Sequence, residues 1–125
     1  MYEGGVLQGV DLVILRVLTW QPAGGVLVIA VQLDFAGATL NQYDQALEWL
    51  GLLPGGPAAR GQLFHWVTAT NDGVRAVDVW ESRAAFDTYF EARVRPVLPK
   101  VGVPSPPDIR VFEVHNYFPG GRPRT

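Results

Sequence analysis

The chain has 125 residues, with 10 lysines and arginines against 12 aspartates and glutamates, and a formal net charge of −2. This length favours a single domain with its own hydrophobic core, and the charge balance argues against nucleic acid or an anionic membrane surface as a partner. The absence of cysteine excludes disulfides, thiolate nucleophiles and cysteine-ligated metals, and two histidines make a histidine-rich metal site implausible.

Residues 1–25 contain an apolar run from Leu12 to Leu18 that Arg16 interrupts. The run is too short to span a bilayer, and the opening Met-Tyr-Glu lacks the basic residues of a secretory signal. We therefore expect a cytoplasmic protein without a membrane segment. Residues 1–25 are either an extra edge strand or an extension in front of a domain that begins at Val26.

The first strand and the first helix are predicted between residues 26 and 51. Val26–Phe35 is a run of β-branched and other apolar residues of strand length. Thr39 and Gln42 fit a capping box, which marks the start of a helix. Apolar residues at helical spacing follow until Gly51, where the helix should end: Leu40, Tyr43, Leu47 and Leu50.

A hairpin is predicted after the glycine- and proline-rich loop 51–61. Its strands are Gln62–Thr70 and Val74–Trp80. Between them lies Asn71-Asp72-Gly73, and an Asp-Gly pair favours the positive φ angles that a two-residue hairpin turn needs. The sequence therefore places Asp72 and Gly73 at the centre of the turn.

The last third of the chain is predicted to form a helix and a strand. Ser82 should cap the helix, and its apolar stripe, which includes Phe86 and Phe90, runs until Pro96 breaks or kinks it. The final strand is predicted over Ile109–Phe118. Residues 119–125 are expected to be a flexible tail.

The resulting order, β-α-β-β-α-β, has one compact arrangement with right-handed crossovers: a ferredoxin-like α+β domain, with a four-stranded antiparallel sheet and both helices on one face. Residues 26–31 are apolar on both sides of their strand, so the face without helices also needs cover. A second copy of the chain would supply it. We therefore expect a homodimer that forms a dimeric α/β barrel.

Two segments resemble a known family. They are Val77-Asp-Val-Trp-Glu-Ser82, ahead of the second helix, and the closing Phe112-Glu-Val-His-Asn-Tyr-Phe118. Over residues 26–118 the chain is similar to actinobacterial proteins of the dimeric α/β barrel superfamily, which includes antibiotic biosynthesis monooxygenases, haem-degrading enzymes and lactone isomerases. The resemblance implies the fold and the dimer.

Three functions stay open on this resemblance. The first is a cofactor-independent, monooxygenase-like enzyme that acts on an aromatic or polyketide-like substrate. The second is a non-catalytic binding or structural homodimer. The third is a haem-binding or haem-degrading protein, which would require an axial histidine over a pocket wide enough for a porphyrin.

His65 and Asp78 are the candidate catalytic residues. If Asp72 and Gly73 form the turn, His65 lies opposite Trp80, and Asp78 shares their face of the sheet. A carboxylate beside an imidazole can fix its tautomer and raise its basicity, which suits a general base. The alternative is a hydrogen-bonded structural contact without catalysis.

The candidate ligand-binding residues combine aromatic surface with a polar group, which suits a small aromatic ligand in an apolar cavity: Tyr43, Trp80, His115, Asn116 and Tyr117. The strands that carry His65 and His115 should lie at opposite edges of the sheet, roughly 14 Å apart. The two histidines then cannot share a metal within one subunit, and we predict neither a metal site nor a cofactor. For His115, a hydrogen bond across the dimer is the alternative role.

Overall fold

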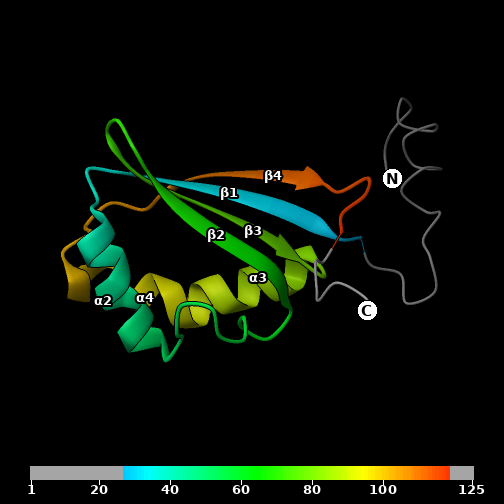
Figure 1. Ribbon diagram of the computed structural model, residues 1–125, viewed down its shortest axis with the longest axis horizontal. Helices are drawn as coiled ribbons and strands as arrows, with labels where there is room; N and C mark the ends of the chain where they lie inside the picture. Colours follow the sequence, from blue (N-terminus) through cyan, green and yellow to red (C-terminus); the bar gives the residue numbers. More distant parts are fainter. Residues whose placement is uncertain (1–26, 119–125) are drawn as a thin grey trace, which may run out of the picture.

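The computed structural model describes residues 27–118 (Figure 1). The predicted extension or extra strand at 1–25 and the predicted tail at 119–125 lie outside the described residues. Within them the predicted order is confirmed: β1 (Ile29–Ala36), α2 (Leu40–Leu50), β2 (Gln62–Thr70), β3 (Gly73–Trp80), α3 (Arg83–Tyr89), a π-helical turn (Phe90–Val94), α4 (Arg95–Val97), a 3₁₀ turn (Pro99–Val101) and β4 (Asp108–Glu113).

The four strands form one antiparallel sheet in the order β2-β3-β1-β4. Figure 1 shows α2, α3 and α4 together on one face of this sheet. This is the ferredoxin-like α+β arrangement that the sequence predicts. As expected, β2 and β4 occupy opposite edges. No helix among residues 27–118 is long and apolar enough to cross a membrane.

The caps that the sequence predicts are present. The Thr39 hydroxyl accepts from the Gln42 backbone N–H at 3.1 Å, and the Gln42 side chain accepts from the Thr39 N–H at 2.9 Å. Gly51 ends α2 with a φ of 74°, a left-handed conformation that glycine adopts without a steric penalty. Ser82 caps α3 by accepting from the Ala85 N–H at 3.0 Å. Both helices therefore start where a side chain satisfies a free backbone donor.

The predicted register of the β2–β3 hairpin is wrong by two residues. Thr70 pairs with Gly73, and His65 pairs with Asp78 rather than with Trp80. The turn is therefore centred on Asn71-Asp72 instead of Asp72-Gly73. Because side chains alternate with a period of two, a shift of two residues leaves His65, Asp78 and Trp80 together on their predicted face.

Gly73 has a different role from the one predicted. It begins β3 and pairs with Ala36 of β1, and a Cβ atom at this position would collide with the carbonyl oxygen of Phe35. Glycine is needed here because two backbones approach closely, not because the turn needs a positive φ.

The second helix also departs from the prediction, because Pro96 does not end it. The Arg95 N–H donates to the Phe90 carbonyl, five residues back, and the chain then continues helically as α4. A proline ring clashes with the carbonyl four residues before it and has no N–H to offer. The wider π turn just before Pro96 accommodates that ring while the helix continues.

The last strand is shorter than predicted, since β4 ends at Glu113 rather than at Phe118. Its partner β1 begins at Ile29, which pairs with Glu113. One further backbone hydrogen bond joins the Val114 N–H to the Val28 carbonyl at 3.0 Å. β4 ends opposite the first residue of β1, because backbone hydrogen bonds between strands need a residue on each strand.

The core lies between the sheet and the helices. Val31, in a central strand, is completely buried, and Trp80 is 1% exposed. The Trp80 ring contacts Phe86 edge to face, with ring centroids 5.8 Å apart. The opposite face of the sheet is open, and three large apolar side chains on it are about half exposed: Phe64, Trp66 and Phe112.

Candidate functional site

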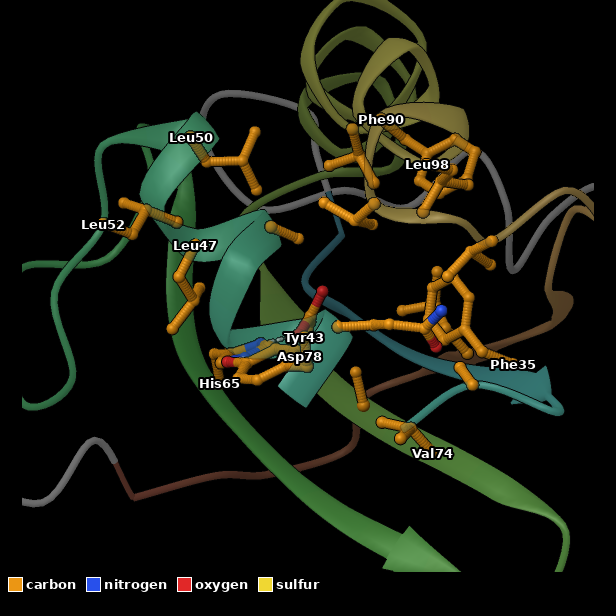
Figure 2. Close-up of a pocket in the computed structure, with 18 of the residues that line it drawn as sticks. Phe35, Tyr43, Leu47, Leu50, Leu52, His65, Val74, Asp78, Phe90 and Leu98 are labelled. Atoms are coloured by element: carbon orange, nitrogen blue, oxygen red, sulfur yellow. Dashed lines mark hydrogen bonds and ion pairs between the residues drawn. The ribbon is translucent and has the colours of Figure 1, made fainter. Parts of the chain in front are cut away.

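A cavity opens between the helix side of the sheet and the two helical segments, α2 and the α3–α4 segment (Figure 2). Apolar side chains form most of its wall, among them Phe35, Leu47, Leu50, Val74, Phe90 and Leu98. The cavity volume is about 120 Å³, similar to that of an apolar cavity of roughly 150 Å³ that holds one benzene ring. No residue of α2 is fully buried, and side chains on its inner side, among them Leu47 and Leu50, line this cavity.

His65 and Asp78 meet in the wall of the cavity. They are direct cross-strand partners on β2 and β3, and His65 Nδ1 lies 2.5 Å from Asp78 Oδ1. The Asp78 side chain is 8% exposed, and that of His65 is 28% exposed. A carboxylate at this position accepts from an Nδ1–H, and in the neutral imidazole with that tautomer Nε2 is the acceptor.

This pair is extended at both ends. The Trp80 Nε1–H donates to Asp78 Oδ2 at 3.1 Å, so both carboxylate oxygens have a donor. At the other end the Tyr43 hydroxyl lies 2.6 Å from His65 Nε2, and Figure 2 shows Tyr43, His65 and Asp78 side by side. Four side chains from α2, β2 and β3 thus form one continuous hydrogen-bonded chain, here called the Trp80–Tyr43 chain.

The electrostatics of the site determine which groups carry protons. Burial, together with the negative charges of Asp78 and Asp44, raises the pKa of Tyr43 to about 12. Burial also raises the pKa of Tyr89, and Asp78 adds to this effect although Arg93 opposes it. Both hydroxyls are therefore protonated at neutral pH, and with the proton of the neutral imidazole on Nδ1, Tyr43 is the donor in its hydrogen bond to Nε2.

The structure thus brings together four of the residues predicted as site residues and separates the other three from them. Tyr43, His65, Asp78 and Trp80 all line the cavity. His115, Asn116 and Tyr117 lie beyond the end of β4, are exposed, and do not line it. Their predicted ligand-binding role remains a prediction without a contact to this cavity.

Some polar residues that line the cavity were not predicted as site residues, among them Tyr89 and Gln62. Tyr89 belongs to the apolar stripe of the second helix and could have been found from helical spacing. Gln62 could not, because strict alternation places it on the face opposite His65. A bulge between Gln62 and Phe64 shifts it toward the cavity.

No group of three metal-binding side chains gathers among residues 27–118. The haem hypothesis requires a histidine with a free ring nitrogen over the pocket. In the described structure both ring nitrogens of His65 are engaged, and His115 is outside the cavity. The Trp80–Tyr43 chain instead has the groups for proton transfer: an ionised carboxylate, an imidazole and a hydroxyl.

Fold and site together define a ferredoxin-like α+β domain with an apolar cavity and a polar chain in its wall. No family model matches the sequence, and comparison with curated proteins gives no match. Similar solved structures include a conserved protein from Methanosarcina mazei Go1, with 12% identity and a TM-score of 0.49 over 70% of this chain and 93% of that one. Another is a monooxygenase from the gene ActVA-Orf6 of Streptomyces coelicolor in complex with Nanaomycin D, with 22% identity and a TM-score of 0.46 over 74% of this chain and 91% of that one.

Proposed function

We propose that this protein binds a small aromatic or polyketide-like molecule in the cavity, and that His65, paired with Asp78, serves as the general base. One observation carries the proposal: the Trp80–Tyr43 chain lies in the wall of an apolar cavity. A purely structural ion pair needs no such space beside it. A base that sits in an apolar wall can act on a ligand that the wall binds.

The reaction that we propose is a monooxygenation without a cofactor. Loss of a proton from a phenolic or enolic hydroxyl makes the ring electron-rich enough to react with dioxygen. In the balanced reaction a phenol and one dioxygen molecule give a quinone and water. One oxygen atom enters the ring, the other leaves in the water, and the substrate supplies all the electrons, so no external reductant is needed.

Oxygen uptake with the hydroxyanthrone dithranol tests this function. We expect enzyme-dependent uptake with formation of the quinone, and we expect Asp78→Asn to lower kcat by about 100-fold or more. The matched control is Asp87→Asn, which removes an exposed carboxylate whose partner is Arg83 and should leave kcat unchanged. Binding of dithranol without uptake would support the non-catalytic alternative, and absence of binding would overturn the proposal.

We also propose that a second copy covers the open face of the sheet. Phe64, Trp66 and Phe112 are 45–51% exposed there, and exposed apolar patches of this kind mark interaction surfaces. The same face carries both signs of charge, including Asp34, which accepts from Arg75 Nε at 2.7 Å. A surface with both signs can pair with itself about a two-fold axis without net repulsion.

Sedimentation equilibrium tests the dimer. Trp66→Glu places a charge on the open face and is expected to convert a dimer into a monomer. Trp49→Glu is the control, because Trp49 is 56% exposed on α2, away from the open face, and should leave the assembly intact. A monomeric protein of unchanged sequence would rule out the dimer.

A further inference from the structure

We propose that Tyr43, rather than His65, is the group that contacts the ligand, and that its hydroxyl relays a proton from a ligand hydroxyl to His65. This inference rests on the proposed function, and it deepens that function by naming the ligand class. The site then takes neutral phenols or enols that can donate a hydrogen bond to Tyr43.

The first argument is that His65 has no ring nitrogen free for a ligand. An imidazole has two nitrogens. Nδ1 is 2.5 Å from Asp78 and Nε2 is 2.6 Å from the Tyr43 hydroxyl. The Tyr43 ring also stacks on the imidazole, with centroids 5.9 Å apart and an interplanar angle of 12°. Both residues line the cavity, and the Tyr43 hydroxyl occupies the one ring nitrogen of His65 that Asp78 leaves open.

The second argument is the direction in which hydrogen bonds are donated. Trp80 and His65 both donate to Asp78, so that carboxylate can hold a positive imidazolium beside it. Tyr43 uses its only hydrogen on His65 and keeps oxygen lone pairs for another donor. A ligand hydroxyl is such a donor. The chain is thus already polarised to move a proton away from the cavity.

The proton transfers balance in two coupled steps. The ligand O–H proton passes to the Tyr43 oxygen while the Tyr43 proton passes to His65 Nε2. The products are a ligand anion and an imidazolium that Asp78 stabilises, and Tyr43 is neutral again. The raised pKa of Tyr43, about 12, disfavours a standing tyrosinate, so the two transfers occur together.

The third argument concerns the charge of the ligand. No lysine or arginine lines the cavity among the described residues, and its polar wall groups outside the Trp80–Tyr43 chain are the neutral side chains Thr39, Gln42, Gln62 and Tyr89. A ligand that entered as a carboxylate or phosphate would find no cation to pair with. A neutral hydroxylated ring loses less hydration on entry and acquires its charge only beside the imidazolium.

Para-nitrophenol tests the relay, because its anion absorbs visible light and its neutral form does not. In weakly acidic buffer, where the free phenol is neutral, we expect the bound phenol to show the anion band. The full-length Tyr43→Phe variant should still bind para-nitrophenol but lose the anion band at least about tenfold. Thr88→Val removes an exposed hydroxyl from α3 and should keep the band; circular dichroism verifies the fold of both variants.

The outcomes separate the relay from the function on which it rests. If Tyr43→Phe retains or strengthens the anion band, His65 acts directly on the ligand and the relay is wrong while the general base survives. If the unaltered protein binds para-nitrophenol and its methyl ether, para-nitroanisole, equally and without an anion band, the relay is overturned and a binding cavity remains. If it binds neither these compounds nor dithranol, the proposed function itself fails.

Discussion

Tyr43→Phe should change the stability of the protein in a way that depends on pH. The substitution removes only the hydroxyl that donates to His65 Nε2 at 2.6 Å. At about pH 8 the variant loses this hydrogen bond, which is worth about 1 kcal/mol of unfolding free energy. At higher pH, ionisation of Tyr43 in the unfolded chain lowers the unfolding free energy of the unchanged protein. The difference in unfolding free energy between the two proteins should therefore shrink.

The size of the change follows from the pKa of Tyr43, which is raised from 10.0 to about 12 in the folded protein. Because the folded value is the higher one, the stabilisation is complete below pH 10 and is lost as the pH rises toward 12. At about pH 11 the unfolded chain has gained about 1.4 kcal/mol from ionisation of this residue, and the folded chain almost nothing. Solvent screening at a partly exposed side chain reduces this to about 1 kcal/mol.

Urea unfolding of both proteins at about pH 8 and about pH 11 measures the effect. The penalty for Tyr43→Phe should be about 1 kcal/mol at the lower pH and near zero at the higher pH. The comparison cancels the ionisation of all other tyrosines, since both proteins share them. A penalty that stays constant with pH would refute the placement of a protonated, partly buried Tyr43 hydroxyl against His65.

Two further predictions concern the packing around the site. Asp78→Asn turns one of two accepting oxygens into a donor at a buried position, and should lower the unfolding free energy by about 2–4 kcal/mol in urea; Asp87→Asn, at an exposed ion pair, should cost under about 0.5 kcal/mol. Gly73→Ala should cost about 2–4 kcal/mol, because its Cβ collides with the Phe35 carbonyl. Gly37→Ala, at a φ of 79° with open space around it, should cost about 1 kcal/mol, and equal thermal shifts for the two alanine variants would contradict this account.

The sequence alone determined the elements and their order, because the signals for them are local. Aromatic and β-branched residues defined β2 over Gln62–Thr70, and the capping residues Thr39 and Ser82 marked both helix starts. It also placed His65 and Asp78 on one face of the sheet. That inference survived a register error of two residues, since a period of two is insensitive to such a shift.

Only the tertiary structure decided which groups meet at the cavity. Tyr43 and His65 are 22 residues apart in the chain, and their contact depends on how α2 packs over β2, which no local pattern encodes. The bulge that turns Gln62 inward and the π turn before Pro96 are likewise backbone irregularities that the spacing of apolar residues does not predict. The physical reason is that side-chain periodicity is set within an element, whereas contacts between elements depend on packing among residues distant in the chain.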